Sequence, residues 1–290
     1  MIDAQTELYG VIGNPVRHSL SPILHNGAFE RLGWNAIYLA FEIKNLEEAL
    51  RGIRGLEVKG VSVTIPFKAE VVPFLDEVEG LEKKIGAVNT IVNRGGKLIG
   101  YNTDCDGALE ALEEKINLSG KKIVLLGAGG AARAIGFGLK ERDCQLIIAN
   151  RSRDRGEALS RELQCHYLPL SSLFRMKSGD LEADVMINAT SLGMSPQERE
   201  SPVPKGLFKE GMMVMDIVYQ PLQTKLLREA EEKGCLTING LEMLVRQGAI
   251  KFEIWTGRRP EIRQIKEDLR RVLEGESPKA QSAKLQIGKR

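Results

Sequence analysis

Residues 123–132 read Ile-Val-Leu-Leu-Gly-Ala-Gly-Gly-Ala-Ala, a short apolar run that leads directly into a glycine-rich turn. This order matches the G-x-G-x-x-[G/A] pattern in its proper context, with a strand before it and a helix after it. Gly127 permits the tight turn, Gly129 lets the backbone approach a pyrophosphate, and Ala132 keeps the helix close to the sheet. The first N–H groups of that helix would face the anion. A plain strand-to-helix turn also favours glycine, but this context favours a dinucleotide site.

The end of the next strand indicates which dinucleotide binds. About 20 residues after the glycines, an NAD site places an Asp or Glu on the ribose 2′-hydroxyl. Here residues 150–155 read Asn-Arg-Ser-Arg-Asp-Arg, with no acid at the expected position. A carboxylate would repel a 2′-phosphate, whereas Arg151 can hold it through paired hydrogen bonds. The alternative is that these arginines only form a solvated helix start. We favour the phosphate site, and therefore NADP.

Short apolar segments alternate with helical ones on both sides of this motif. Strands are predicted at 8–13, 36–43, 61–65, 122–126, 145–149, 185–189, 212–218 and 236–238, with a hairpin over 87–101 and helices at 22–32 and 106–115. Such alternation predicts crossover connections and mainly parallel sheets. The fold class is therefore α/β with two domains, an N-terminal substrate domain with a mainly parallel sheet and a C-terminal Rossmann NADP-binding domain.

The domain boundaries follow from the same pattern. The substrate-binding and catalytic domain is expected to span residues 1–105, and the Rossmann domain residues 106–240. Two amphipathic stretches, 241–255 and 262–273, are expected to return to the first domain, which then also includes about 241–274. Residues 275–290 are polar without periodicity, and we expect a flexible tail there.

The composition of the 290 residues excludes several classes of protein. Hydrophobic residues make up 42% and charged residues 28%, so disorder is not the main state. A formal charge of +2 predicts neither nucleic acid nor a membrane surface as the main partner. No apolar run approaches the ~20 residues of a bilayer span. The four cysteines lack C-x-x-C spacing and the three histidines are scattered. We therefore expect a cytoplasmic protein with no disulfide framework and no metal.

Polar residues gather at four places in the first half of the chain, where strands are predicted to end. They read HSLSP at 18–22, SVTIPFK at 62–68, GAVNT at 86–90 and GYNTD at 100–104. Loops at strand ends are where α/β proteins place ligand-binding groups. Ser19 and Ser21, just ahead of a helix, can bind a carboxylate, and one of them can also cap that helix. Lys68 can equally be a surface lysine, and Asp104 can equally cap the helix that follows it.

Taken together, these motifs resemble the shikimate dehydrogenase family. The resemblance runs from Gly10 to about Arg270 and also includes GAGGAAR at 127–133, NRS at 150–152, NATSLGM at 188–194 and GLEMLVRQG at 240–248. It implies reversible NADP-linked reduction of 3-dehydroshikimate to shikimate, in the pathway to the aromatic amino acids. It also implies an enzyme that acts as a monomer or homodimer on a small-molecule substrate.

The resemblance further implies roles for individual residues. Lys68 and Asp104 are expected to be catalytic. The substrate-binding set is Ser19 and Ser21 for the carboxylate, Thr64, Asn89 and Asp104 for hydroxyls, and Lys68, Tyr219 and Gln247. The cofactor-binding set is Gly127, Ala128, Gly129, Gly130, Ala131, Asn150, Arg151, Ser152, Arg155, Thr190, Ile217 and Gly240. One position departs from the family, which usually has Asn where this chain has Ser62. A serine hydroxyl is shorter and lacks an amide's separate donor and acceptor.

The chemistry explains why a lysine and a carboxylate are expected together. Reducing a ketone requires a hydride on carbon and a proton on oxygen, and a protonated lysine can supply the proton. For the reverse oxidation Lys68 has to be neutral, which the nearby Asp104 carboxylate opposes. We therefore expect Lys68 and Asp104 to act as a coupled pair, with a stronger pH dependence for oxidation than for reduction.

Two other functions fit parts of the sequence. An enzyme of the same family that oxidises quinate with NAD would need an acid near Arg151 and altered hydroxyls at the Ser19 position, and neither is evident. A non-catalytic NADP-binding sensor would keep the glycine loop without needing both Lys68 and Asp104. Two domains also suggest closure around the ligands, with hinges expected near Asp106 and Gly240.

Overall fold

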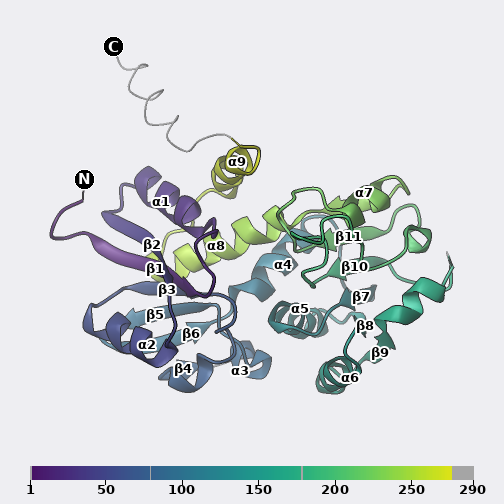
Figure 1. The fold of residues 1–290 in the computed structure, drawn as a ribbon, viewed down its shortest axis with the longest axis horizontal. Helices are drawn as coiled ribbons and strands as arrows, with labels where there is room; N and C mark the ends of the chain where they lie inside the picture. Colours follow the sequence, from purple (N-terminus) through teal and green to yellow (C-terminus); the bar gives the residue numbers. More distant parts are fainter. Residues whose placement is uncertain (1, 79, 178, 276–290) are drawn as a thin grey trace, which may run out of the picture.

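The computed structural model of the chain describes residues 2–78, 80–177 and 179–275. It contains two sheets at opposite ends of an elongated molecule (Figure 1). The expected tail lies outside the described residues, apart from Gly275. No helix among the described residues combines the length and apolar character needed to cross a bilayer.

The N-terminal sheet has six strands in the order β2-β1-β3-β5-β6-β4. They are β1 (Glu7–Gly13), β2 (Ala36–Glu42), β3 (Gly60–Val63), β4 (Glu77–Val78), β5 (Thr90–Arg94) and β6 (Lys97–Tyr101). The first three strands are parallel, whereas β5 runs antiparallel to both of its neighbours. The expected hairpin is β5–β6, and its turn contains Gly95 and Gly96, both at positive φ.

The second sheet also has six strands, and every pair in it is parallel. The strands are β7 (Lys122–Leu126), β8 (Gln145–Asn150), β9 (His166–Pro169), β10 (Val185–Asn188), β11 (Met213–Asp216) and β12 (Leu236–Ile238). Their order, β12-β11-β10-β7-β8-β9, is that of a doubly wound dinucleotide-binding fold, with its switch point between β7 and β10. The predicted α/β class with a Rossmann domain is confirmed.

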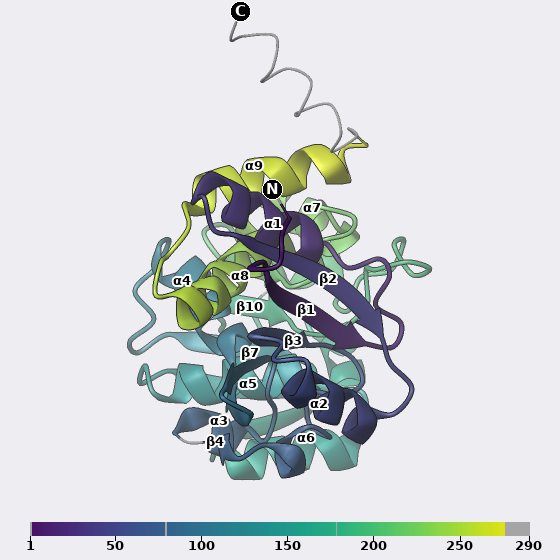
Figure 2. The same ribbon diagram turned by 90° about the vertical axis from the view of Figure 1, so that its left-hand side faces the viewer.

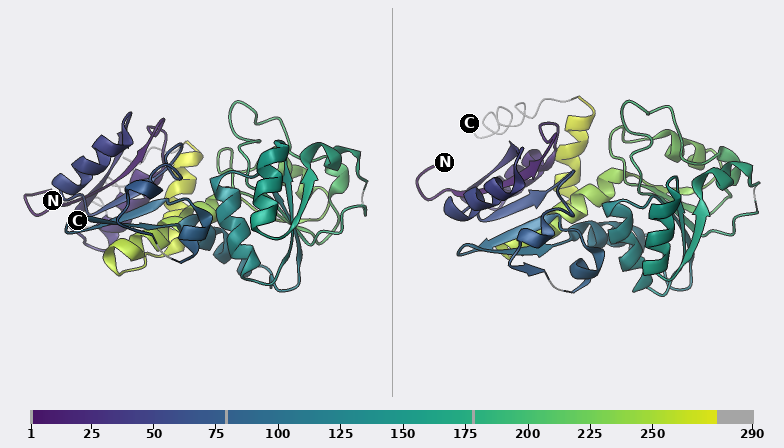
Figure 3. Two further views of the ribbon diagram at one scale, coloured as in Figure 1. Left: turned by 90° about the horizontal axis from the view of Figure 1, so that it is seen from below. Right: turned by 60° about the horizontal axis from the view of Figure 1, so that its bottom comes forward.

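Helices cover both sheets and join them. They are α1 (Ser21–Arg31), α2 (Leu46–Gly55), α3 (Leu81–Ile85), α4 (Thr103–Glu113), α5 (Gly130–Lys140), α6 (Arg153–Glu162), α7 (Lys225–Glu231), α8 (Gly240–Thr256) and α9 (Ile262–Leu273), with 3-10 turns η1 (Val72–Phe74), η2 (Leu170–Arg175) and η3 (Lys205–Leu207). Both α4 and α8 lie between the sheets, as the views in Figure 3 show. They approach closely, because a Cβ on Gly107 would lie 2.7 Å from the Cβ of Gln247.

The last two helices return to the N-terminal half of the chain. From α8, the Trp255 indole donates to the carbonyl of Ile91 in β5 at 3.0 Å. The α9 helix lies beside α1 (Figure 2), where Arg31 and Asp268 form an ion pair of 2.5 Å. These contacts hold α8 and α9 against the first sheet although they follow the second sheet in the sequence.

Local sequence signals account for most element boundaries. Asn45 caps α2, because its side chain accepts from the Glu48 N–H at 3.2 Å. The helix expected from residue 106 begins earlier, at Thr103, and its cap is Asn102 rather than Asp104. The predicted third strand ends at Val63, so Thr64 lies in the loop that follows. The elements β4, β9 and α3 were not expected.

Candidate active site

The loop after β3 and the start of α4 place Lys68 against Asp104. Their Nζ and Oδ2 atoms are 2.6 Å apart, and the carboxylate side chain is 8% exposed against 25% for the lysine. Asn102 caps the N-terminal end of α4, where Asp104 lies, because its side chain accepts from the Asp104 N–H at 3.1 Å. The carbonyl of Lys68 in turn accepts from the Val88 N–H at 2.7 Å. The lysine is thus a half-buried partner of Asp104 and not an exposed surface lysine.

Asn89 connects the segments around this ion pair. Its Oδ1 accepts from the Thr90 hydroxyl at 2.8 Å and from the Thr103 N–H at 2.9 Å. Its own carbonyl accepts from the Val63 N–H at 2.9 Å, which places Thr64 beside it. Asn89 is fully buried. Four of the residues expected to handle substrate, Thr64, Lys68, Asn89 and Asp104, therefore converge at one edge of the first sheet.

The electrostatics of Asp104 favour its ionised form. Burial alone would raise the pKa of this carboxyl, but the charges of Lys68 and Lys251 and hydrogen bonds outweigh the effect, so its pKa is below the ordinary value. Burial also acts on Lys251, lowering its pKa to about 7 against the opposing influence of Asp104. The site thus contains a second amine, which we did not expect from the sequence.

The two serines expected to bind a carboxylate lie at the start of α1. The N-cap residue of this helix is Leu20, with no side-chain cap, while the Ser19 hydroxyl accepts from the Ser21 N–H at 3.2 Å. Neither serine is the N-cap that the alternative interpretation expected. The Ser21 hydroxyl also interacts with buried Tyr38, whose hydroxyl donates to Ser62 at 2.7 Å. Ser62, the departure from the family pattern, is therefore held by Tyr38 and faces the interior.

The glycine loop leaves open space at the start of α5. Gly127 has a φ of 115°, and a Cβ there would lie 3.0 Å from the carbonyl oxygen of Ala189, so only glycine fits without strain. Gly129 and Gly130 face no atom within 4 Å of an added Cβ, and both are exposed. Ala132 is fully buried on the sheet side of the helix. The free N–H groups of α5 thus open onto a space that suits a pyrophosphate.

The arginines after β8 lie beside this space and are available to an anion. Within the described residues, Arg151 and Arg155 are exposed and form no ion pair, whereas Arg153 is paired with Glu157 at 2.7 Å. Asn150 shapes the turn, since its amide donates to the Ser152 carbonyl at 2.8 Å. Two exposed guanidinium groups that form no ion pair with another described residue suit a 2′-phosphate.

A buried polar network behind the loop after β10 was missed in the sequence. Asn188 donates to Asp216 at 2.9 Å and accepts from the Thr190 hydroxyl at 2.7 Å. The Thr224 hydroxyl donates to the second oxygen of Asp216, also at 2.7 Å. Burial raises the pKa of Asp216 to about 6. The sequence does place a polar residue at the end of each strand, Asn188 in β10 and Asp216 in β11. Only the order of the strands in the sheet shows that these two residues are neighbours.

The remaining expected residues lie along the segment from β11 to α8. A Cβ on Gly240 would lie 2.4 Å from the Ile217 carbonyl oxygen, so these two backbone segments touch. Tyr219 is half-buried, and burial raises its pKa. The Gln247 amide donates to the Leu244 carbonyl at 2.8 Å and is therefore turned toward its own helix. The structure thus places Ile217 and Gly240 side by side and engages the Gln247 amide with its own helix.

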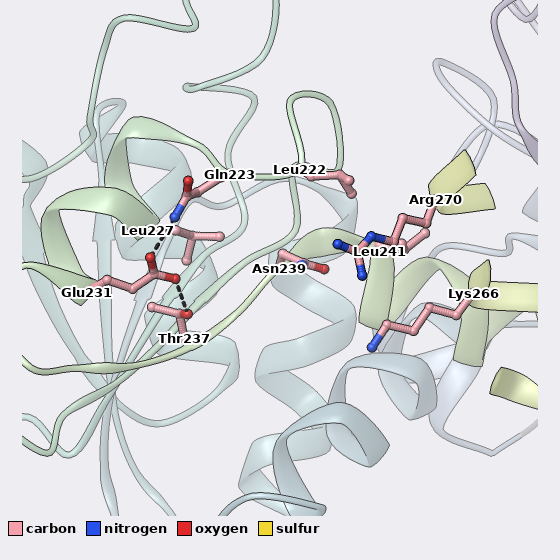
Figure 4. Close-up of a pocket in the computed structure, with 9 residues that line it drawn as sticks. All are labelled: Leu222, Gln223, Leu227, Glu231, Thr237, Asn239, Leu241, Lys266 and Arg270. Carbon is pink, nitrogen blue, oxygen red and sulfur yellow. Dashed lines mark hydrogen bonds between the residues drawn. The ribbon is translucent and has the colours of Figure 1, made fainter. Parts of the chain in front are cut away.

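A separate cavity of about 290 Å³ lies among α7, β12, α8 and α9 (Figure 4). Its lining residues are Leu222, Gln223, Leu227, Glu231, Thr237, Asn239, Leu241, Lys266 and Arg270. Glu231 is already engaged, since it accepts from Gln223 at 2.6 Å and from Thr237 at 2.8 Å. The cavity borders Gly240 but contains none of the expected site residues. The described residues also contain no cluster of three or more His, Cys, Asp or Glu that could hold a metal ion.

Comparison with known proteins identifies the family. Residues 11–91 match the shikimate dehydrogenase substrate binding domain, residues 109–221 the shikimate / quinate 5-dehydrogenase family, and residues 240–270 the shikimate 5′-dehydrogenase C-terminal domain. The shikimate dehydrogenase (NADP(+)) of Pyrococcus furiosus is 47% identical over 266 residues, which are 89% of this chain and 93% of the relative.

Solved structures agree with this assignment. A shikimate dehydrogenase crystallised with NADP+ has a TM-score of 0.89 and 43% identity, covering 94% of this chain and 98% of its own. The enzyme of Thermus thermophilus, solved with NADP(H) and shikimate, has a TM-score of 0.84 and 39% identity, covering 92% and 99%. The sequence, the fold and the paired Lys68 and Asp104 lead to one conclusion, that this chain belongs to the shikimate dehydrogenase family.

Proposed function

We propose that this chain catalyses the reversible NADP-linked reduction of 3-dehydroshikimate to shikimate, a step toward the aromatic amino acids. The observation that carries the proposal is the Lys68–Asp104 pair, 2.6 Å between Nζ and Oδ2, in a chain of this family. A sensor would need only the dinucleotide site. A paired lysine that keeps partial exposure is what proton transfer to a ketone requires.

The residues of the second sheet fit NADP. The open space at Gly129 and Gly130 accommodates a pyrophosphate at the start of α5. Arg151 and Arg155 are free to hold the 2′-phosphate, and the Asn150 amide fixes the turn that presents them. We assign Ala128, Ala131, Ser152, Thr190, Ile217 and Gly240 to the same site, because they lie on the loops and helix starts at this edge of the sheet. When bound, the reduced nicotinamide supplies the hydride.

The first domain binds the substrate and moves the proton. Ser19 and Ser21 are assigned to the carboxylate, and Thr64 and Asn89 to ring hydroxyls. The Lys68 ammonium donates to the carbonyl oxygen and releases its proton as the alkoxide forms. Asp104 keeps the ammonium in place, since it stays ionised at neutral pH. Tyr219 and Gln247 are assigned to the far side of the substrate, which Gln247 reaches when its amide leaves the Leu244 carbonyl.

We also propose the division of labour between the parts of the chain. Residues 1–105, with the returning segment 241–274, form the substrate-binding and catalytic domain, and residues 106–240 form the Rossmann domain. The contacts of α8 and α9 with α1 and β5 support this division.

All four cysteines are free thiols, which supports a reducing, cytoplasmic location. A monomer or a homodimer is proposed, and light scattering of the purified protein distinguishes the two.

The test is a set of initial rates at 340 nm with shikimate or quinate, each with NADP or NAD. We expect rapid NADP reduction with shikimate and much slower turnover in the other three mixtures. Faster turnover with quinate or with NAD would overturn the substrate or the cofactor assignment while leaving the family unchanged. Tight NADP binding without turnover in any mixture would indicate a sensor.

A further inference from the structure

Lys251 is a buried lysine that has no role in the function proposed above. It lies in α8 and is only 5% exposed. It follows Gln247 by four residues, so the two side chains leave the same face of the helix. This face packs against α4, the helix that begins beside Asp104. The helix therefore aims Lys251 at the same edge of the first sheet that Lys68 and Asp104 occupy.

The Lys251 amine interacts electrostatically with groups from three segments of the chain. Its charge acts on Asp104 of α4, on Lys68 of the loop after β3 and on His25 of α1. The His25 ring stacks on Tyr38 with a centroid separation of 4.5 Å, and Tyr38 contacts both Ser62 and Ser21. The amine thus lies inside the cluster to which we assign the substrate.

The donors of Lys251 are unused. An ammonium group has three of them, yet within residues 2–78, 80–177 and 179–275 Lys251 has no hydrogen bond and no ion pair, while Asp104 is engaged by Lys68. In this part of the chain, the polar side-chain atoms that are sealed from solvent without a partner are His25 Nδ1, Asn239 Oδ1 and Arg246 Nε. The Lys251 Nζ is not one of them, so it retains contact with solvent. A buried amine of this kind is stabilised when a ligand oxygen reaches it.

We propose that Lys251 is a further substrate-binding residue, whose ammonium donates a hydrogen bond to an oxygen of the hydroxylated ring acid beside Asp104. The proposal rests on the function proposed above. The proposal also explains how the site compensates for having Ser62 where the family usually has Asn. The Ser62 hydroxyl is engaged by Tyr38, and the Lys251 ammonium supplies a hydrogen-bond donor from α8 instead. Lys251 thereby helps the site to prefer substrates that carry an oxygen at this position.

The proposal predicts a pH dependence of substrate binding. Burial lowers the pKa of Lys251 to about 7 in the free protein. A ligand that accepts from the ammonium binds the charged form, so affinity is greatest well below pH 7, falls as the pH rises above the pKa of the free amine, and levels off above the higher pKa of the bound amine. Among the neighbours, Asp104 is ionised, while His25 is neutral because burial and then Lys251 lower its pKa. Tyr38 is neutral because burial raises its pKa.

The experiment is isothermal titration of shikimate into the full-length protein from pH 6.0 to 8.5. Lys251→Met and Lys251→Arg are compared with the wild type, and Lys233→Met, an exposed lysine after α7, is the matched control. Lys68 is present in all four proteins and is therefore a constant background. Thermal unfolding checks that each variant is folded.

We expect the Kd of the wild type to rise as the pH passes 7. Lys251→Met should bind about 10- to 100-fold more weakly at pH 6.0, with little further change up to pH 8.5. Lys251→Arg should bind within a few-fold of the wild type at pH 6.0 and keep that affinity at pH 8.5, because its charge persists. Lys233→Met should follow the wild type.

Two kinds of failure are distinguishable. A wild type that binds no shikimate overturns the proposed function and this inference with it. A wild type that binds shikimate with an affinity independent of pH overturns the inference alone, even if Lys251→Met does not fold. The inference is also wrong if Lys251→Met binds as tightly as the wild type, or if Lys251→Arg loses affinity above pH 7 as the wild type does.

Discussion

Replacing Asp216 by Asn should stabilise the protein at neutral pH. The carboxyl is fully buried between β10 and β11, no cation among the described residues faces it, and burial raises its pKa from 3.8 to about 6. A raised carboxyl pKa means that the folded state holds the proton more tightly than the unfolded state. The contribution of Asp216 to stability is therefore most favourable below pH 4, falls as the pH rises from about 4 to 6, and is constant above that. The shift corresponds to a cost of about 3 kcal/mol at pH 7 and above.

The hydrogen bonds around residue 216 explain why an amide can replace the carboxyl. Oδ1 accepts from the Asn188 amide at 2.9 Å and from the Val218 N–H at 3.0 Å, and an amide oxygen can accept both bonds. Oδ2 accepts from the Thr224 hydroxyl at 2.7 Å, and an amide nitrogen there can donate to the same hydroxyl after it rotates. Each of these polar groups then keeps a partner, and the Thr190 loop keeps its anchor.

Thermal unfolding at pH 4.5, 6.0 and 8.0 measures this effect. We expect the free energy of unfolding of Asp216→Asn to exceed that of the wild type by about 1–3 kcal/mol at pH 8.0, with most of the gain lost at pH 4.5. Asp154→Asn, at an exposed position of α6, is the control and should show no such gain. If Asp216→Asn is less stable than the wild type at pH 8.0, or equally stabilised at every pH, the carboxylate is not the source of the cost.

Three further predictions concern the catalytic and cofactor sites. Lys68→Met should lower kcat in both directions by about 10²- to 10⁴-fold and remove the pH dependence of kcat for shikimate oxidation, and near-normal turnover with an unchanged pH profile of kcat would refute its role. The double change of Arg151 and Arg155 to Ala should raise the KM for NADP by about 10-fold or more while leaving NAD kinetics unchanged, and an equal loss with both cofactors would show that the arginines do not contact the 2′-phosphate. Gly240→Ala should cost about 1–3 kcal/mol of stability, because its Cβ would lie 2.4 Å from the Ile217 carbonyl oxygen; an unchanged Tm would mean that the backbone there yields.

The parts of the fold that the sequence predicts well are those with local causes. The second sheet follows from apolar runs between helical segments, and the glycine loop from a strand and a helix that are adjacent in the chain. The N-cap of α2 is likewise visible because Asn45 acts on a residue three positions away. Met212, Met213 and Met215 are buried, as expected for a core strand.

The parts that the sequence does not predict depend on contacts between distant segments. Asp104 was a candidate helix cap, but Asn102 is the cap, and the carboxylate is free for Lys68, 36 residues away. Lys251 reads as one of two cations in an amphipathic helix until that helix is placed against α4. Asp216 reads as a strand end until β10 and β11 are known to be neighbours. Pairing across the sheet and helix packing supply this information, and neither leaves a periodic pattern.

The position of α8 constrains how the two halves of the molecule can move. Gly107 and Gln247 approach so closely that α4 and α8 cannot slide past each other without a steric clash. Asp106, where a hinge was expected, lies inside α4 next to this contact. We therefore expect α4 and α8 to move together as one rigid unit, with any bending outside both helices. Crystal structures with and without both ligands test this, because a change within α4 rather than at its ends would refute it. Closure of this kind would carry the glycine loop toward Lys68 while the α4–α8 contact keeps Lys251 in place relative to Asp104.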